Sequence, residues 1–139
     1  VIPANINSEI CDEAKTIAKK ISEKLKYTGT LCVEFFIDKE NKLYVNEIAP
    51  RVHNSGHLTI NAFNISQFEN HVRAVCGLEK IELQKKSDAK MVNIIGDEIN
   101  EYRGKLLNKN QFLFDYQKKE IKDKRKMGHI TTLLDTKDS

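Results

Sequence analysis

The stretch "TLCVEFFIDKENKLYVNEIAPRVHNSGH", residues 30–57, decides the fold because it holds two alternating segments separated by a short polar turn. In the first segment, apolar side chains occupy every second position: Leu31, Val33, Phe35 and Ile37 alternate with Cys32, Glu34 and Phe36. This period of two predicts a strand, and "LYVNEIA" (residues 43–49) is predicted to return beside it. We therefore expect an antiparallel hairpin followed by a polar loop.

The register of this hairpin has a chemical consequence. A two-residue turn at Glu40 and Asn41 would place Glu34 directly opposite Glu47. Two carboxylates about 5 Å apart on one face repel each other unless something positive lies between them. Mg²⁺ is commonly held by one or two carboxylates while nucleotide phosphates supply the other oxygens. Glu34 and Glu47 are therefore candidate magnesium ligands, with Asn46 as a candidate third oxygen; the alternative is an ordinary sheet with a solvent-facing glutamate.

The polar loop after the second strand gathers side chains that bind anions. Arg51 can hold a carboxylate or phosphate through two parallel hydrogen bonds. Asn54 and Ser55 begin an "NSG" turn, in which glycine lets backbone amides approach an anion. His53 and His57 can donate to an oxyanion or transfer a proton. The alternatives are a polar surface turn and, for His57, a core histidine bonded to a backbone carbonyl.

Two helices are predicted around this region. "SEICDEAKTIAKKISEKLKY" (residues 8–27) repeats apolar residues at steps of three and four, and Ser8 is its candidate N-cap. A second helix begins at Ser66, with Glu69 completing a capping-box pattern, and Gly77 ends it. The predicted apolar face of this helix is formed by Phe68, Val72, Val75 and Cys76.

The later part of the chain is predicted to be rich in strands. "MVNII" (91–95) is predicted to be a short buried strand, and "EINEYRGKLLNK" (98–109) to be helical or irregular. "FLFDY" (112–116) and "HITTLLD" (129–135) are predicted strands that flank a charged run. We expect an α+β fold with one domain at residues 1–80, an antiparallel sheet with helices, and a small β-rich domain at 81–139.

Composition narrows the class of protein. Forty per cent of the 139 residues are hydrophobic, which favours a folded globular chain, and the formal net charge is only +3. No apolar run approaches the roughly 20 residues of a membrane span, and the first residues lack the pattern of a secretion signal. The three cysteines are widely spaced within apolar patterns, which predicts small buried hydrophobes in a reducing compartment. We expect a soluble cytoplasmic protein.

The charged run "KKEIKDKRK" (118–126) has six basic residues among nine. Its ordinary interpretation is a solvated hairpin tip. A phosphate site would need one pair, such as Lys118 and Arg125, to meet across the hairpin. Nucleic-acid binding is less favoured, because no aromatic residues are interleaved in the run and the net charge is modest.

Most of the chain resembles one family of enzymes. "GTLCVEFFID", "LYVNEIAPRVHNSGHLTINAFNISQFENHVRAVCGL", "MVNIIGD" and "KRKMGHITTL" are similar to the carboxyl-terminal part of the N5-carboxyaminoimidazole ribonucleotide synthetases. These are ATP-grasp ligases of purine biosynthesis. Asp123 and Lys124 stand where this family usually has Pro-Gly.

The resemblance implies roles for individual residues. Glu34 and Glu47 would hold Mg²⁺ on the phosphates of ATP, with Asn46 beside them. In the loop, the residues that would line the site where bicarbonate meets the substrate amine are Arg51, His53, Asn54 and Ser55. Lys118 and Arg125 would hold the phosphate of 5-aminoimidazole ribonucleotide. The reaction implied is ATP-dependent carboxylation through carboxyphosphate, with release of ADP and phosphate.

The resemblance also implies that a larger enzyme surrounds this segment. The family's amino-terminal domain, its flexible glycine-rich loop and its ATP-binding lysines have no counterpart here, so we expect residues 1–139 to be inactive alone. The family is commonly dimeric, which makes a homodimer the expected assembly. The alternatives are another ATP-grasp enzyme, such as a formate-dependent transformylase or a biotin carboxylase, and a non-catalytic module that binds a phosphorylated ligand or RNA.

Overall fold

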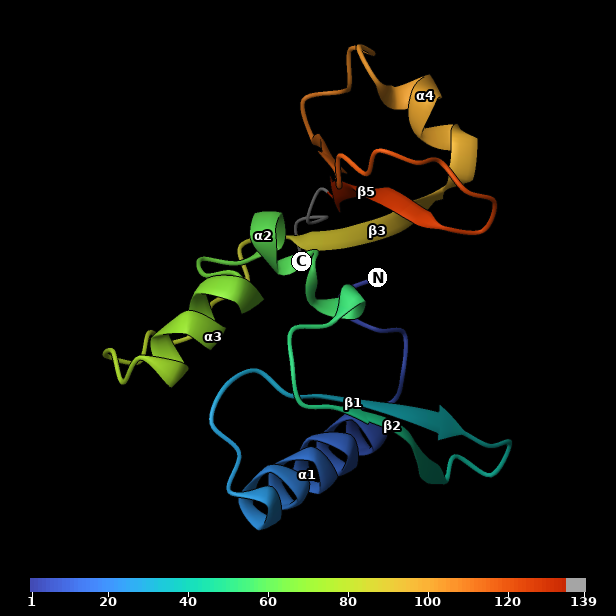
Figure 1. Ribbon diagram of the computed structural model, residues 1–139. Coiled ribbons are helices and arrows are strands. Elements are labelled where there is room, and N and C mark those ends of the chain that lie inside the picture. Colours follow the sequence, from blue (N-terminus) through green and yellow to red (C-terminus); the bar gives the residue numbers. More distant parts are fainter. Residues whose placement is uncertain (135–139) are drawn as a thin grey trace. The chain divides into compact units, whose positions relative to one another are not determined.

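The computed structural model describes residues 1–134, which form two compact units (Figure 1). The hairpin unit contains Ala4–His57 and Ile65–Leu83. The sheet unit contains Val1–Pro3, Leu58–Asn64 and the described part of the chain from Gln84 onward. Helices and small antiparallel sheets occur together, which confirms the predicted α+β class. The boundary predicted at residue 80 stays a prediction.

The hairpin unit consists of helices α1 (Ser8–Leu25) and α3 (Gln67–Val75), strands β1 (Cys32–Ile37) and β2 (Leu43–Ala49), and the 3₁₀ turn η1 (Asn54–Gly56). Helix α1 lies alongside the two strands (Figure 1). Its N-cap is Asn7 and not the predicted Ser8, because the Asn7 side chain accepts a 2.8 Å hydrogen bond from the amide of Glu9. Asparagine and serine cap helices about equally well, so the spacing alone did not choose between these neighbours.

The predicted pairing of the two acids is confirmed. Strands β1 and β2 are antiparallel, and Glu34 lies opposite Glu47. Toward the turn the register shifts, because Phe35 pairs with Val45 and leaves Asn46 as an extra residue in β2. Asn46 therefore forms a β-bulge directly beside the acid pair.

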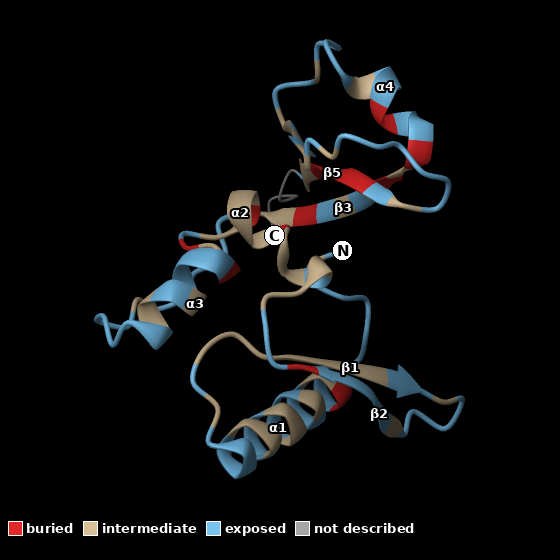
Figure 2. Cartoon of the chain, in the orientation of Figure 1, coloured by how far each residue is buried: buried red, intermediate tan, exposed pale blue. Residues whose placement is uncertain are grey.

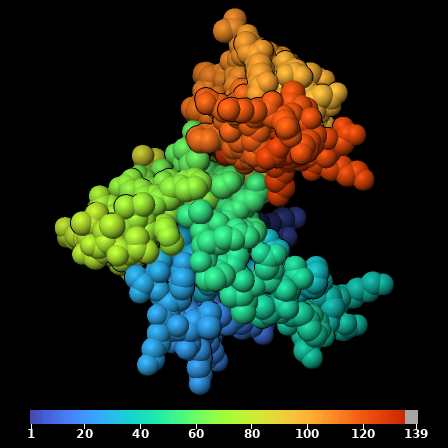
Figure 3. All heavy atoms as spheres, viewed as in Figure 1, coloured from blue at the N-terminus to red at the C-terminus, as the bar shows by residue number. Residues whose placement is uncertain are grey.

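The predicted two-residue turn is wrong. The Asp38 amide donates to the Lys42 carbonyl (3.1 Å), which leaves a three-residue loop between them. Asn41 ends that loop with a φ of 65°, a left-handed conformation that asparagine tolerates. The amide of Lys42 also donates to the Asp38 carboxylate and lowers its pKa. The extra loop residue and the bulge shift the register in opposite directions, which explains why the acids still pair. Figure 3 shows the hairpin tip, in teal, projecting at the surface.

The ends of helix α3 match the prediction, but its apolar face is largely exposed to solvent. The Ser66 hydroxyl accepts from the Glu69 amide at 3.1 Å, and Gly77 follows the helix with a φ of 63°. The predicted apolar face is exposed instead: Phe68 by 39%, Val72 by 52% and Val75 by 53%, and Cys76 is exposed as well. A helical stripe shows which residues share a face but not whether another element covers it. The buried residue of this helix is Gln67.

The sheet unit contains α2 (Thr59–Ala62), β3 (Asp88–Ile95), η2 (Gly96–Glu98), α4 (Ile99–Tyr102), β4 (Gln111–Asp115) and β5 (Lys126–Leu134). The sheet is antiparallel with the order β3-β5-β4, so β5 is its central strand. One hydrophobic core cluster of this unit is formed by Ile94, Ile99, Met127 and Ile130. Figure 2 shows the buried residues concentrated along β5 in this unit.

Strand β3 is longer and less buried than "MVNII" predicted. Ile94 is only 1% exposed, whereas Val92, two residues earlier on the same face of the strand, is 47% exposed. The core around Ile94 therefore covers only one end of this face, and an apolar run in the sequence does not show where along a strand the core ends. The segment predicted to be helical or irregular is both, since α4 is one turn long and irregular chain follows it. Asp135, the last residue of a predicted strand, lies outside the described residues.

Candidate functional site

The acid pair of the hairpin unit is accessible to a ligand and is met by groups from the polar loop. The side chains of Glu34 and Glu47 are 40% and 50% exposed. Oε1 of Glu34 lies 3.5 Å from Nε2 of His53, and Oε1 of Glu47 lies 3.7 Å from a guanidinium nitrogen of Arg51. The predicted repulsion between the acids is thus offset by partners in the loop, and the structure brings together four residues that the sequence singled out.

Asn46 contacts Glu34 through its amide nitrogen, which lies 3.4 Å from Oε2. The bulge places this side chain, because an extra residue in one strand changes the direction of its neighbours. In this arrangement Asn46 orients the carboxylate of Glu34. Its predicted contribution of an oxygen ligand stays a prediction.

The imidazole of His53 has a defined orientation. Its Nδ1 accepts from the backbone amide of Ser55 at 3.4 Å and lies 2.9 Å from the Ser55 hydroxyl. A backbone amide can only donate, so Nδ1 is the acceptor, and the ring proton sits on Nε2, facing Glu34. The Ser55 hydroxyl also lies 3.7 Å from the sulfur of Cys32. Glu34, His53 and Ser55 therefore form a connected polar chain.

The loop bends through η1, in which Asn54 is the first residue. The amide of His57 donates to the Asn54 carbonyl at 3.1 Å, and the amide of Gly56 donates to the His53 carbonyl at 3.0 Å. The Arg51 guanidinium donates to the Val52 carbonyl at 3.0 Å. The loop is thus a compact turn stabilised by its own backbone, as the "NSG" pattern predicted.

Gln67 is a site residue that the sequence reasoning missed. Its side-chain oxygen accepts from the His53 amide at 2.9 Å, and its side-chain nitrogen donates to the His53 carbonyl at 2.8 Å. The same nitrogen lies 2.8 Å from Nδ1 of His57, whose ring stacks on Phe68 with centroids 5.4 Å apart. A glutamine in the first turn of a helix is usually exposed, so no local signal indicated this role.

The two basic residues predicted to bind phosphate lie on the loop between β4 and β5 in the sheet unit. The Lys118 ammonium donates to the carbonyl of Lys126 at 2.6 Å, and it lies 5.3 Å from the centre of the Tyr116 ring. The strand pairing ends at Asp115 and Gly128, so both residues lie beyond the paired part of the hairpin. Both side chains are partly buried, and Arg125 donates to the carbonyl of Glu120 at 3.4 Å. Each cation thus contacts a backbone carbonyl of its own hairpin, and their shared role in binding phosphate stays a prediction.

The turn of this loop forms without the Pro-Gly of the resembled family. The Arg125 amide donates to the Lys122 carbonyl at 3.1 Å, which closes a four-residue turn. Lys124 occupies the third position of the turn with a φ of 60°. That conformation favours glycine, so the lysine holds it at a local cost.

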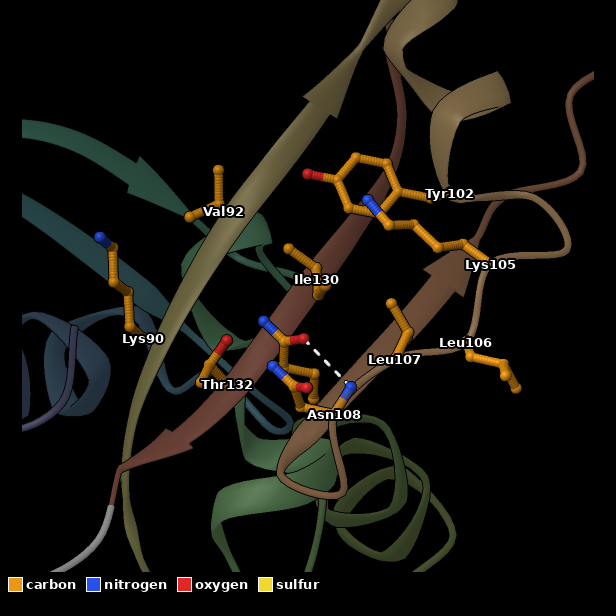
Figure 4. Close-up of a pocket in the computed structure, with 10 residues that line it drawn as sticks. Lys90, Val92, Tyr102, Lys105, Leu106, Leu107, Asn108, Ile130 and Thr132 are labelled. Atoms are coloured by element: carbon orange, nitrogen blue, oxygen red, sulfur yellow. Dashed lines mark hydrogen bonds between the residues drawn. The ribbon is translucent and has the colours of Figure 1, made fainter.

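A separate hollow of about 440 Å³ lies in the sheet unit (Figure 4). Its lining consists of Lys90, Val92, Tyr102, Lys105, Leu106, Leu107, Asn108, Gln111, Ile130 and Thr132. None of the predicted site residues belongs to this lining. Within residues 1–134, no group of three or more His, Cys, Asp or Glu side chains could hold a metal ion unaided. No helix in the same range is long and apolar enough to cross a membrane.

Comparison with protein families assigns two regions of the chain. Residues 1–68 match the ATP-grasp domain, and residues 89–139 match the phosphoribosylaminoimidazole carboxylase C-terminal domain. Together with the paired acids and the loop beside them, these matches define the class: an ATP-grasp segment followed by a carboxylase C-terminal domain.

Individual relatives narrow the class further. The chain is 46% identical over 132 residues to the N5-carboxyaminoimidazole ribonucleotide synthase of Brucella melitensis and 43% identical over 140 residues to that of Bacillus subtilis. These alignments cover 95% and 99% of the chain but only 36% and 37% of the relatives. The chain belongs to the N5-carboxyaminoimidazole ribonucleotide synthase family and corresponds to a carboxyl-terminal portion of its members.

Solved structures agree with this assignment. The Staphylococcus aureus N5-carboxyaminoimidazole synthetase complexed with ADP has a TM-score of 0.86 and 42% identity, over 97% of this chain and 37% of that one. The synthase of Aspergillus clavatus in complex with ADP and 5-aminoimidazole ribonucleotide has a TM-score of 0.87 and 33% identity, over 96% of this chain and 38% of that one. The relatives and the solved structures are all N5-carboxyaminoimidazole synthases or synthetases, which favours this family over the transformylase and biotin-carboxylase alternatives.

Proposed function

We propose that this chain supplies one part of the active site of an ATP-dependent ligase that carboxylates 5-aminoimidazole ribonucleotide with bicarbonate. The observation that carries the proposal is the pairing of Glu34 with Glu47 beside a loop that contacts both acids. The rest of the site, including the other contacts to ATP, lies in the upstream part that full-length relatives carry. The complete enzyme is proposed to act as a homodimer in the cytoplasm.

Glu34 and Glu47 are the proposed ligands of Mg²⁺ bound to ATP. Two exposed carboxylates are a suitable donor set, since Mg²⁺ takes only oxygen ligands and phosphates complete its coordination. When bound, the ion neutralises the charge that develops on the transferring phosphoryl group. Asn46, which donates to Glu34, keeps that carboxylate in place.

The polar loop is the proposed site of bicarbonate and carboxyphosphate. An oxygen of bicarbonate attacks the γ-phosphorus of ATP and ADP leaves; the exocyclic amine then attacks the carboxyl carbon and phosphate leaves. The Arg51 guanidinium holds anionic oxygens, and His53 offers Nε2–H as a donor. Asn54 begins the turn, and Ser55 contacts the His53 ring and orients it. Exclusion of water by the closed site would protect the reactive intermediate.

Lys118 and Arg125 are the proposed contacts to the phosphate of the ribonucleotide. A planar guanidinium can hold two phosphate oxygens, and an ammonium adds a point charge beside it. The contact of Lys118 with the Lys126 carbonyl, next to Arg125 in sequence, supports a shared site for the two cations.

The test is ADP release by the full-length protein with ATP, Mg²⁺, bicarbonate and 5-aminoimidazole ribonucleotide. Activity should require all four components and fall at least about 100-fold in Glu47→Gln, because the amide cannot replace the anionic ligand. Residues 1–139 alone should be inactive. A full-length protein that is folded and binds ATP but releases no ADP with all four components would overturn the proposal.

A further inference from the structure

Gln67 has the environment of a core residue although it begins a largely exposed helix. Its side chain is 7% exposed, whereas Phe68 beside it is 39% exposed. Within α3, Gln67 is the buried residue. A buried amide is stable only when its donors and acceptors are bonded, so its partners explain why it is there.

Those partners lie on the polar loop, ten and fourteen residues earlier in the chain. The amide of Gln67 forms two hydrogen bonds to one residue: it accepts from the His53 N–H at 2.9 Å and donates to the His53 carbonyl at 2.8 Å. Two bonds from one planar group fix both the position and the rotation of the His53 backbone. The second hydrogen of the same nitrogen is available to Nδ1 of His57 at 2.8 Å.

Gly56 leaves the space that this amide needs. A Cβ at Gly56 would meet the side-chain oxygen of Gln67 and lie 2.7 Å from its Cδ, which is closer than real side chains approach. Gly56 is not among the glycines with a positive φ, so its backbone would accept another residue. The requirement for glycine here therefore comes from Gln67 and not from the backbone conformation.

We propose that Gln67 is a positioning residue of the ligase site: its amide holds the His53 backbone so that the His53 imidazole faces Glu34. We call the set Gln67, His53, Gly56 and His57 the amide clamp. Its catalytic consequence rests on the proposed function, because it acts through His53 and Glu34. The clamp itself is a property of the chain that can be measured without any activity.

The first experiment measures hydrogen exchange in the full-length protein. In Gln67→Met the side chain keeps its length but loses both bonds to His53, so amides in residues 52–57 should exchange at least about 10-fold faster. Asn70→Met, at an exposed position of the same helix, is the matched control and should leave this segment unchanged. Unchanged protection of residues 52–57 in Gln67→Met would overturn the clamp.

The second experiment measures kinetics in the same full-length protein. Gln67→Ala should lower kcat about 10- to 100-fold, as loss of a residue that orients a site residue does, while the KM for ATP changes little. Gln67→Met, which keeps the length of the side chain but forms neither bond to His53, serves as the second variant if Gln67→Ala does not fold. An unchanged kcat in a folded variant would overturn the positioning role.

A double-variant comparison separates the clamp from general damage. Gly56→Ala should lower kcat about as much as Gln67→Ala, because it displaces the same amide, and the two together should cost little more than either alone. Equal and additive losses would show that Gly56 is needed for another reason and would overturn the clamp. If the unaltered full-length protein has no ligase activity, the proposed function fails, but the exchange experiment still decides the clamp.

Discussion

The polar loop of the hairpin unit and the basic loop of the sheet unit both follow an antiparallel strand and both carry predicted site residues, yet they are held differently. The polar loop, residues 51–57, is bonded to a buried side chain from another element, Gln67. The basic loop, residues 116–125, is held chiefly through backbone carbonyls: the Lys118 ammonium donates to the Lys126 carbonyl, and the Gly96 amide donates to the Arg125 carbonyl at 2.9 Å.

This difference determines how each loop responds to substitution of a single residue. A loop anchored by one buried amide depends on a residue distant in sequence, and the loss of that residue affects several backbone groups at once. A loop held chiefly through backbone carbonyls depends less on any one side chain, because every residue supplies a carbonyl, so single substitutions change it by small amounts.

Substitution of the acid that faces the polar loop should have the largest effect. Glu34→Gln should lower kcat of the full-length enzyme at least about 100-fold, because it removes a proposed metal ligand and the partner of His53. Steady-state ADP release measures the change. Glu40→Gln, in the turn of the same hairpin, is the control and should retain full activity. Equal activity in Glu34→Gln and Glu40→Gln would contradict the proposed site.

The basic loop should affect substrate affinity more than the chemical step. Lys118→Ala and Arg125→Ala should each raise the KM for the ribonucleotide about 10- to 100-fold, the value of one charge-assisted hydrogen bond of about 1.5–3 kcal/mol. The KM for ATP should stay the same. Lys122→Ala is the matched control, since this exposed lysine pairs with Glu120 in the same loop. A rise in the KM for ATP alone would remove these cations from the substrate site.

The stability of the protein should depend on pH through Asp115, which lies at the start of the basic loop. Its carboxylate accepts from Arg103 at 2.8 Å and from the Gln117 amide at 2.8 Å, and the bond from Arg103 is the main cause of its lowered pKa. A carboxyl whose pKa is lowered by folding stabilises the folded state above its ordinary value of about 3.9 and loses that contribution as pH falls through the folded pKa.

Asp115→Asn should therefore destabilise the protein by about 1 kcal/mol at neutral pH, the upper range for an exposed ion pair. The difference should be fully present above the ordinary carboxyl pKa of about 3.9 and should close as pH falls through the lower pKa of the native Asp115 carboxyl. Urea unfolding of the two proteins across this range measures it. Asp123→Asn, an exposed acid in the same hairpin, is the control, and a gap that widens in acid would contradict the prediction.

The smallest expected effect is a gain in stability at the tip of the basic loop. Lys124→Gly should stabilise the turn by about 0.5–1 kcal/mol, because Lys124 has a φ of 60° that glycine adopts without a steric cost. Slower hydrogen exchange of the Arg125 amide, which closes the turn, measures the gain. Lys119→Gly, at an exposed position with no positive φ, should give no such protection.

Local pattern predicted much of the fold and the centre of the site. The alternation in residues 30–49 located β1 and β2 and paired Glu34 with Glu47, although the turn was wrong and only the bulge at Asn46 restored the register. The serine and glycine that bound α3 were predicted because caps act on the backbone within one turn. Sequence reasoning also joined the acids to His53 and Arg51 as one candidate site.

The sequence by itself determined the strands, the caps of α3 and the family, and it paired Glu34 with Glu47 because a short hairpin turn sets which residues face each other. Only the tertiary structure decided the buried role of Gln67, the space at Gly56 and the exposure of the apolar face of α3. The physical reason is the kind of partner involved. Gln67 is bonded to backbone groups fourteen residues away, and backbone groups are the same in every residue, so no sequence pattern records the contact.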